Sequence, residues 1–344
     1  MKEAKRRIQE CLYRKDTVLD LSGLGLVDLP DNLPASLKEL HCQYNQLRLL
    51  PDNLPASLEQ LHCLGNQIQI LPINLPTSLT ELDCSNNQIQ VLPDNLPTSL
   101  TLLDCSNNQI EMLPTNLPTS LTKLYCFYNK LQVLPKIPDS LIYLSCSLNK
   151  IQMLPDNLPA SLTVLECDNN QIQMLPTNLP ASLTELDCSD NQIQVIHSLP
   201  ASLTELFCND NQIQVIHSLP VSLKILHCNR NKIQKLPTNL PVSLEEIFCN
   251  NNDIQVLPKN IPASLTYLYC RNNPVQLLPL KLRSIDCKID CVKINKLYYN
   301  EAVNVTKRTT NKYKWRKWFY QWGCYLKIQQ FIDPDSSKIV INYL

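Results

Sequence analysis

Glycine is scarce in this sequence, which has only four glycines among 344 residues. They nowhere form the GxGxxG or GxxxxGK[ST] patterns in which a closely approaching backbone cradles phosphate groups. Long apolar runs are absent as well, and a membrane-spanning helix needs about 18 consecutive apolar residues. The sequence therefore lacks the main features of nucleotide-binding folds and of integral membrane proteins.

A secretory signal is also missing from the first 16 residues, which carry six basic and three acidic side chains but no apolar segment. We therefore expect a cytoplasmic protein, acting in the cell that makes it or in a host cell. The composition is globular, with 44% hydrophobic residues and 31 basic side chains balancing 31 acidic ones. Sixteen cysteines are many for such a compartment, so their spacing must explain them.

The cysteines recur at intervals of 21 residues, with a few intervals of 20. The regular positions are Cys42, Cys63, Cys84, Cys105, Cys126, Cys146, Cys167, Cys188, Cys208, Cys228, Cys249 and Cys270. Aligned on them, each unit follows the pattern LxxLxCxxNxIxxLPxNLPxS. A period of this length predicts a solenoid, and the pattern matches the leucine-rich repeat with cysteine in place of the third leucine. The predicted fold class is α/β, a leucine-rich repeat solenoid with a curved parallel sheet on its concave face.

The repeat region spans residues 17–287, with about 12 full repeats and a degenerate one at each end. In the last, worn repeat we place Cys287 in the cysteine position and Asp290 where the asparagine belongs. Intervals of 20 residues are interpreted as short deletions on the convex side, which a solenoid tolerates.

Helical caps are expected at both ends, because a solenoid exposes its core there. In residues 1–16, Ile8, Cys11 and Leu12 have helical spacing among basic residues. Residues 288–344 are basic and aromatic, and four of their aromatics, which have helical spacing, predict a capping helix. Membrane or nucleic-acid binding through this tail is the alternative. The first 16 residues carry +3 and the tail +7, so the repeats between carry −10. The four aromatics are Trp315, Trp318, Phe319 and Trp322.

Each repeat position has an expected structural role. The alternation LxC turns leucine and cysteine into the core and the residue between them outward, on strands stacked about 4.8 Å apart. The asparagine after the strand is expected to bond the backbone of its own and the next turn. Two prolines per repeat predict a polyproline-like, non-helical convex side.

The cysteines are interpreted as small buried apolar side chains that fill the same position in every turn. Neighbouring thiols come close enough for disulfides, but thirteen equivalent positions give no defined pairing. Metal-binding clusters of the CxxC type are missing. We therefore expect structural thiols.

The unit LPxNLPxSLxxLxCxxNxI resembles the short LPX subclass of leucine-rich repeats in effectors that Gram-negative pathogens inject into host cells. Similar cysteine-bearing repeats occur in giant viruses of amoebae, and residues 5–34 resemble the entry segment of the effectors. The resemblance implies a protein-binding scaffold. Effectors with a long C-terminal domain are ubiquitin ligases with a catalytic cysteine, but only residues 288–344 follow Cys287. We expect no enzyme activity and no cofactor; the alternative is a ligase-like effector in which Cys287, Cys291 or Cys324 reacts.

Function is expected on the outward-facing strand positions of the concave face. Acidic side chains gather around Asp83 and Asp104 and again between Glu166 and Asp210, which favours a protein partner with a basic segment. The alternative is a solvated face that binds nothing. Exposed aromatics near arginine have the composition of interface hot spots. We expect a monomer without a small-molecule substrate, and the predicted partner-binding residues are Tyr125, Phe127, Tyr128, Tyr143, Leu148, Phe207, Phe248, Tyr267, Tyr269, Arg271, Asp83, Asp104 and Asp187.

Two histidines, His41 and His62, occupy neighbouring outward positions that lead into Asp83. A metal site on this face needs a third ligand besides the two imidazoles. The sequence shows no closed ligand set, so it predicts no metal site.

Overall fold

The computed structural model describes residues 2–30, 32–275, 278–279, 282 and 284–291. All of them belong to the first of two compact units, which are Met1–Tyr298 and Tyr299–Leu344. The C-terminal cap predicted for residues 288–344 lies outside the described residues beyond Cys291, as do its four aromatics Trp315, Trp318, Phe319 and Trp322.

One helix precedes a long series of short strands. The helix α1 spans Lys2–Arg14. The strands are β1 (Val18–Asp20), β2 (Glu39–His41), β3 (Gln60–His62), β4 (Glu81–Asp83), β5 (Leu102–Asp104), β6 (Lys123–Tyr125), β7 (Tyr143–Ser145), β8 (Val164–Glu166), β9 (Glu185–Asp187), β10 (Val195–Ile196), β11 (Glu205–Phe207), β12 (Val215–Ile216), β13 (Ile225–His227), β14 (Glu246–Phe248), β15 (Tyr267–Tyr269) and β16 (Lys288–Asp290).

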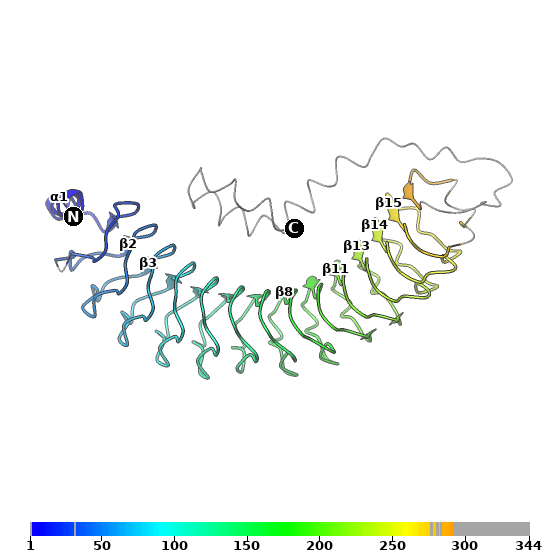
Figure 1. Cartoon of the computed structure of the whole chain (residues 1–344), viewed down its shortest axis with the longest axis horizontal. Coiled ribbons are helices and arrows are strands. Elements are labelled where there is room, and N and C mark those ends of the chain that lie inside the picture. Colours follow the sequence, from blue (N-terminus) through cyan, green and yellow to red (C-terminus); the bar gives the residue numbers. More distant parts are fainter. Residues whose placement is uncertain (1, 31, 276–277, 280–281, 283, 292–344) are drawn as a thin grey trace. The chain divides into compact units, whose positions relative to one another are not determined.

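Fourteen of these strands form one parallel sheet, in chain order from β1 to β16 with β10 and β12 left out. Each strand pairs with the equivalent residues of the next repeat, as Leu82 does with Leu103. Figure 1 shows the strands side by side along the inner side of the arc that the described repeats form. The predicted solenoid with a parallel sheet on its concave face is confirmed.

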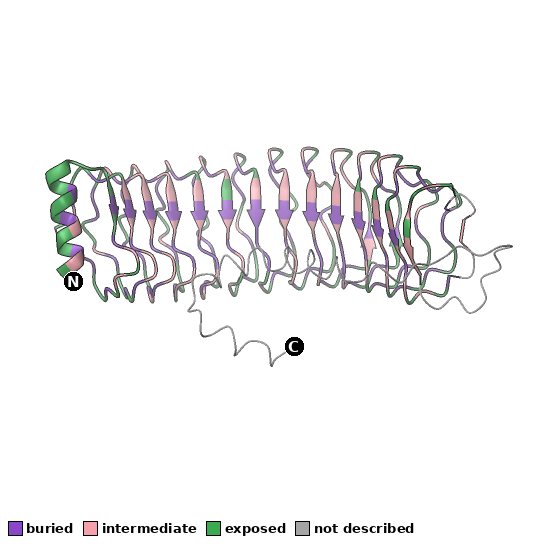
Figure 2. Ribbon diagram, turned by 90° about the horizontal axis from the view of Figure 1, so that it is seen from above, coloured by how far each residue is buried: buried purple, intermediate pink, exposed green. Residues whose placement is uncertain are grey.

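The core follows from the alternation within each three-residue strand. In β4 the central Leu82 is buried between two half-buried neighbours, and Cys84 is fully buried beyond the strand. Most other strands of the sheet have the same burial pattern, and Figure 2 shows the buried part recurring along the successive arrows. Burying one leucine contributes about 1.5–3 kcal/mol relative to leaving it exposed. Because every turn adds the same inward side chains, the buried residues form one continuous core.

The convex side contains no α-helix among the described residues after Arg14, as the paired prolines predict. The convex path departs most from a polyproline-like one where β10 and β12 form a two-stranded parallel sheet of their own, and isolated parallel bridges join Ile70 to Val91 and Lys235 to Val256. In both repeats histidine, at His197 and His217, stands where proline is usual. Histidine keeps the backbone N–H that proline lacks. His217 N donates to Ile196 O at 3.4 Å, so losing the proline adds a hydrogen bond that lengthens the strand pairing.

The asparagine after each strand bonds the backbone of its own turn and of the preceding turn, not the next turn as expected. Asn108 Nδ2 donates to the carbonyls of Cys105 in its own turn and Cys84 in the preceding one, both at 3.1 Å. Its Oδ1 accepts from Ile89 N at 2.9 Å. The expectation of a structural asparagine is confirmed and its direction corrected, because the side chain points back toward the preceding strand.

The register of the last repeat also differs from the expectation. β16 pairs Ile289 with Leu268, so Cys291 and not Cys287 follows in the cysteine column. Asp290 is an outward strand residue, not the equivalent of the asparagine. The segment contains the triplet Ile-Asp-Cys twice, and only the second copy keeps the interval of 21 residues from Cys270. The assignment of Cys287 was wrong for this reason, and the sheet continues past residue 287.

Cys270 and Cys291 are joined by a disulfide, although the sequence analysis expected no defined pairing. Their Cα atoms lie 4.9 Å apart because the two residues occupy stacked positions, and this distance suits a disulfide. The other described cysteines are free thiols.

The helix α1 packs one face on the first turn of the solenoid. The predicted core residue Leu12 is 51% exposed, since it lies one residue outside the buried i, i+4, i+7 stripe. Arg7 Nη1 donates to the carbonyl of Asp20 at 2.9 Å and ties α1 to β1. No helix among the described residues has the length and apolar character needed to cross a membrane. The buried residues of α1 are Ala4, Ile8 and Cys11.

Candidate functional site

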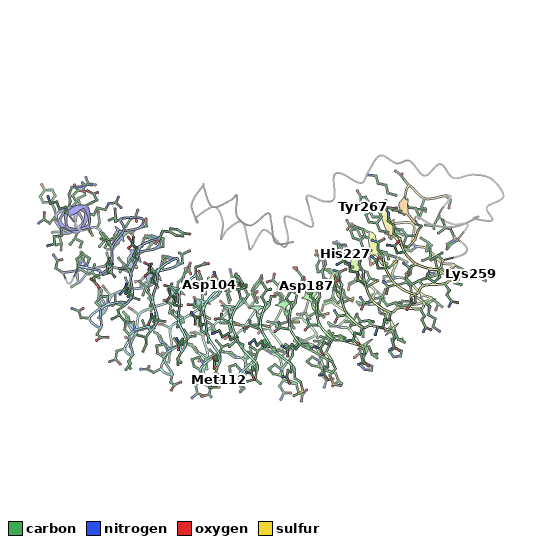
Figure 3. All side chains as sticks on the ribbon, in the orientation of Figure 1. Asp104, Met112, Asp187, His227, Lys259 and Tyr267 are labelled. Atoms are coloured by element: carbon green, nitrogen blue, oxygen red, sulfur yellow. A yellow bond between two sulfur atoms is a disulfide. The ribbon has the colours of Figure 1, made fainter. Side chains whose placement is uncertain are left out.

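The outward positions of the fourteen-stranded sheet form the concave face. Each strand contributes the two residues that flank its buried central side chain, as Glu81 and Asp83 do in β4. Equivalent residues of adjacent parallel strands lie about 4.8 Å apart, so they form two columns along the face. Figure 3 shows on this inner side the labelled residues Asp104, Asp187, His227 and Tyr267, and on the outer side Met112 and Lys259.

The middle of the face combines tyrosines with carboxylic acids. We call Tyr125, Tyr143, Glu166, Glu185 and Asp187, from β6 to β9, the central patch. The rings of Tyr125 and Tyr143 are in contact, with centroids 5.0 Å apart. The Tyr143 side chain hydrogen-bonds to Glu166. The sheet thus brings predicted aromatic and acidic contact residues into one surface.

The carboxylic acids of the central patch crowd one another. Burial, and after it the charge of Asp168, raises the pKa of Asp187 to about 8. Burial, and after it Glu205 and Glu166, raises the pKa of Glu185 to about 7. A cationic side chain placed among these groups would offset the repulsion that their ionised forms suffer.

The first acidic zone adjoins the central patch. Asp83 and Asp104 are directly paired residues of β4 and β5, and Asp104 is paired in turn with Tyr125. Burial raises the pKa of Asp83. One oxygen of each aspartate is held by a serine: Asp83 Oδ1 accepts from Ser85 Oγ at 2.7 Å, and Asp104 Oδ1 accepts from Ser106 N at 3.0 Å. The predicted residues Asp83 and Asp104 therefore extend the same surface.

Tyr128 and Leu148 follow β6 and β7 in the left-handed region, with φ of 53° and 54°. Asparagine occupies the equivalent position in several other repeats, as at Asn107. Left-handed backbone costs about 1–2 kcal/mol for residues other than glycine and asparagine. Tyr128 is nevertheless 49% exposed and Leu148 37%, so two apolar side chains stand beside the half-buried Phe127 where packing does not require them.

A second aromatic group lies toward the C-terminal end of the sheet. The aromatic column consists of Phe207, His227, Phe248 and Tyr269, one residue from each of β11, β13, β14 and β15. Successive ring centroids are 5.1, 4.1 and 4.6 Å apart. The predicted partner contacts include Phe207, Phe248 and Tyr269 but not His227, and the outward position of His227 between two phenylalanines was the signal for it. Tyr267 contacts Tyr269, with centroids 6.4 Å apart, and Lys288 Nζ lies 5.3 Å from the Tyr267 ring centroid.

Arg271, predicted as a partner contact, forms an ion pair with Asp290 of the last strand. The corrected register explains this contact, because Asp290 is an outward residue of the neighbouring strand. Asp210 is paired similarly, since its Oδ1 lies 3.1 Å from Arg230 Nη1. The charges of Arg271 and Asp210 are therefore partly offset by these ion pairs within the chain.

The two histidines near the N-terminal end stack as expected, with the ring centroids of His41 and His62 4.8 Å apart. The structure adds the third group that the sequence analysis lacked. Glu39 lies two residues before His41 on β2, and the ligand atoms of Glu39, His41 and His62 all lie within 4.8 Å of one another. The alternation of side chains along a strand was the signal for this contact.

The cysteines proposed as reactive in the ligase-like alternative have different surroundings. Burial, and after it the charge of Asp286, raises the pKa of Cys287 to about 11, which disfavours the reactive thiolate. Cys291 is held in the disulfide, and Cys324 lies outside the described residues.

Comparisons with known proteins identify the repeat. A family model described as Leucine Rich Repeat matches residues 78–98, whereas comparison with curated proteins gives no match. Among solved structures, the leucine-rich effector protein YopM from Yersinia pestis is 32% identical, with 84% of this chain and 92% of that chain covered and a TM-score of 0.62.

Two further structures share the fold. The functional domain of InlJ from Listeria monocytogenes, described as including a cysteine ladder, is 27% identical, with 80% of this chain and 67% of that chain covered and a TM-score of 0.64. A leucine-rich repeat protein of Leptospira interrogans is 23% identical, with 82% of this chain and 98% of that chain covered and a TM-score of 0.57. The chain belongs to the leucine-rich repeat family and resembles bacterial effectors.

Proposed function

We propose that this chain is a non-catalytic scaffold that binds a protein partner on its concave face, and that the partner inserts a basic segment at the central patch. The observation that carries the proposal is the crowding of carboxylic acids against the Tyr125–Tyr143 pair. Leucine-rich repeat proteins generally bind protein partners, and a repeat scaffold does so through the side chains it presents on its strands.

Electrostatics favours a basic ligand at this surface. Burial first, and after it the charges of neighbouring carboxylates, raise the pKa values of Glu185 and Asp187. A bound lysine or arginine would favour the ionised carboxylates and recover that free energy as binding. The ring of Tyr143, which is hydrogen-bonded to Glu166, and that of Tyr125 offer faces that attract the same cations.

The left-handed residues support the same location. Tyr128 and Leu148 hold exposed apolar side chains at a backbone conformation that asparagine adopts at lower cost. Strain that is retained at an exposed position points to a role outside folding. We therefore include Phe127, Tyr128 and Leu148 as apolar contacts around the central patch.

The proposal extends to the rest of the concave face. The aromatic column and Tyr267 provide a continuous apolar strip for a partner that is long enough to run along the sheet. Asp83 and Asp104 extend the acidic surface in the opposite direction. Arg271 contributes to this surface while paired with Asp290.

We also propose the organisation around this surface. Residues 1–16 cap the N-terminal end of the repeats, in a monomer of the cytoplasm. Similarity to a Yersinia effector, together with the LPX pattern and its giant-virus counterparts, suggests partners in a host cell. Animal and amoebal lysates are therefore the sources to search.

The test uses a peptide array graded from strongly acidic to strongly basic, followed by affinity measurements on the best binders. We expect binding to increase with positive charge and to weaken with added salt, because screening reduces charge attraction. The double variant Tyr125→Ala/Tyr143→Ala should bind at least about tenfold more weakly, as expected when anchoring aromatics are truncated.

The matched control removes two exposed apolar side chains from the convex side, in Met112→Ala/Met153→Ala. This control should bind like the wild type, and should capture the same protein from host lysate. Binding that ignores peptide charge, or that the control loses while the tyrosine variant keeps it, would contradict the proposed surface.

A further inference from the structure

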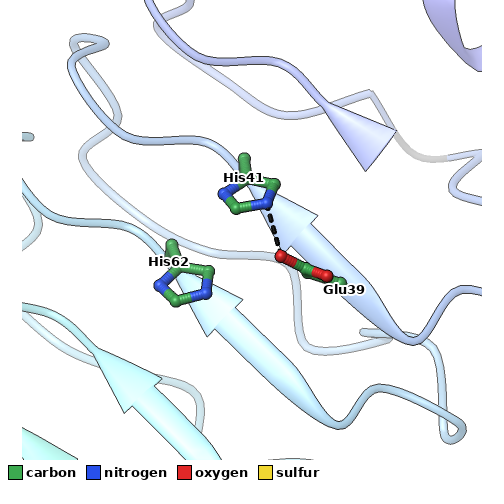
Figure 4. A group of neighbouring side chains, drawn as sticks. All are labelled: Glu39, His41 and His62. Carbon is green, nitrogen blue, oxygen red and sulfur yellow. Dashed lines mark hydrogen bonds and ion pairs between the residues drawn. The ribbon is translucent and has the colours of Figure 1, made fainter. Parts of the chain in front are cut away.

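Three side chains with metal-binding chemistry meet near the N-terminal end of the concave face, apart from the central patch. Glu39 and His41 are two residues apart on β2, so their side chains leave the same side of the strand. His62 on β3 is the direct partner of His41 across the sheet. Figure 4 shows the two imidazoles side by side with the Glu39 carboxylate beside them.

The distances suit convergence on one ion. His41 Nε2 lies 2.7 Å from Glu39 Oε1, and all three ligand atoms lie within 4.8 Å of one another. Zinc binds imidazole nitrogen and carboxylate oxygen at about 2.0–2.2 Å, so the two histidine nitrogens need to approach to about 4 Å or less. The two rings stack with an interplanar angle of 7°. A modest rotation of each ring about its side-chain torsions brings the two nitrogens within this distance of each other.

The surroundings attract a cation and leave it accessible. Asp20 of β1 is the register partner of His41, and Asp83 of β4 is the partner of His62, so a carboxylate flanks the histidine pair on each side. The side chains of Glu39 and His41 are 31% and 26% exposed. Carboxylates next to ligating histidines orient the rings and strengthen metal binding.

The chain contains a second stacked histidine pair for comparison. His197 and His217 have ring centroids 5.9 Å apart, but among the described residues the only group of three metal-binding side chains is that of Glu39, His41 and His62. Histidine stacking alone therefore does not produce the cluster, because a carboxylate must also face the pair.

We propose that Glu39, His41 and His62 bind one zinc ion on the concave face. Three protein ligands leave one position of a tetrahedral zinc open to water. Asp20 and Asp83 act as flanking carboxylates. This site shares Asp83 with the proposed partner surface but none of its three ligands, and it lies apart from the central patch, so either proposal can fail without the other.

The experiment titrates zinc into the full chain after treatment with a chelator, under reducing conditions, and follows binding by calorimetry. The wild type should bind one zinc at this site. His62→Ala should bind at least about tenfold more weakly, and Glu39→Gln should also weaken binding while preserving side-chain size. His197→Ala/His217→Ala is the matched control and should bind like the wild type.

Cobalt absorption spectroscopy separates this site from the free cysteines, whose thiolates also bind zinc. Cobalt held by nitrogen and oxygen should show ligand-field bands without the charge-transfer bands of thiolate ligands. The His62→Ala variant should lose these ligand-field bands. Circular dichroism and thermal unfolding confirm that each variant is folded. Absence of zinc binding in the wild type, equal binding by folded His62→Ala and Glu39→Gln, or a thiolate spectrum would overturn the proposal.

Discussion

At the residue scale, the carboxyl group of Asp187 makes stability depend on pH. Its pKa is raised from 3.8 to about 8 by burial and by Asp168, so between these values the folded state holds a proton that the unfolded state releases. The free energy of unfolding should therefore fall as pH rises through this window, by up to about 1.4 kcal/mol per pH unit while one such group titrates.

Asp187→Asn should reduce this pH dependence, because the amide imitates the neutral acid. We expect the variant to be more stable than the wild type at about pH 8 and similar to it at about pH 4, measured by urea unfolding across the range. Asp210→Asn is the control, since Asp210 is paired with Arg230 and its replacement should bring no gain at high pH. Equal pH profiles for wild type and Asp187→Asn would contradict this account.

The left-handed residues give a prediction in which stability and binding change in opposite directions. Tyr128→Asn and Leu148→Asn should each raise the free energy of unfolding by roughly 0.5–1 kcal/mol, because asparagine tolerates this backbone better. The same variants should weaken partner binding if these side chains are contacts. Chemical unfolding and peptide affinity measure the two effects.

Leu49→Asn controls for the loss of an exposed apolar side chain. Leu49 is 57% exposed and is not among the residues with positive φ, so we expect no comparable gain in stability. A similar gain in this variant would show that the effect comes from surface polarity and not from backbone strain.

At the element scale, the asparagines that follow the strands form a ladder of side-chain hydrogen bonds between successive turns, in addition to the backbone hydrogen bonds of the sheet. Asn108 is only 8% exposed, and its amide serves carbonyls and an N–H of two turns. Asn108→Ala should therefore cost roughly 2–4 kcal/mol, because several buried backbone groups lose their partner. Thermal or urea unfolding measures the loss.

The exposed Gln88 provides the matched polar control, and Gln88→Ala should change stability by no more than about 0.5 kcal/mol. A small effect of Asn108→Ala would mean that water replaces the amide, and that the strands and leucines hold the turns together without the ladder.

Proline shapes the convex side at the same scale. Where histidine replaces it, at His197 and His217, the outer chain forms β10 and β12. These repeats are one residue shorter than most, and their length alone predicts only a deletion on the convex side. Isolated bridges between Ile70 and Val91 and between Lys235 and Val256 form in repeats that keep the proline, so the backbone donor of histidine extends such pairing into the two-residue strands β10 and β12.

At the scale of the whole molecule, a solenoid should open from its ends, since a terminal turn has one neighbour and an internal turn has two. The repeat cysteines report this opening. Cys42, Cys146 and Cys249 are all fully buried, and burial raises the pKa of Cys42 and of Cys249 to about 12. Alkylation near neutral pH should therefore require opening of the turn.

We expect Cys42 and Cys249 to be alkylated faster than Cys146, as measured by mass spectrometry of digested samples over time. Alkylation in urea, where the chain is unfolded, should remove the difference and serves as the control. Uniform rates in the native protein would indicate that the repeats open as a single cooperative unit.

Much of the fold followed from the sequence because the same physical requirement recurs in every turn. The pattern around Leu82 and Cys84 predicted the inward face, and the asparagines and prolines predicted the turn and the convex path. The last repeat was misassigned because two identical Ile-Asp-Cys triplets satisfy the local pattern, and only pairing with β15 distinguishes Cys291 from Cys287.

The sequence by itself determined the period, the buried side chains and the columns of outward residues, since each depends on interactions that repeat along the chain. The tertiary structure decided which outward residues meet: Glu39 with the histidine pair, His227 within the aromatic column, and Arg271 with Asp290. These contacts depend on the register between turns and on side-chain torsions. A pattern along the sequence constrains the register only where the repeats are regular, and it does not constrain the side-chain torsions.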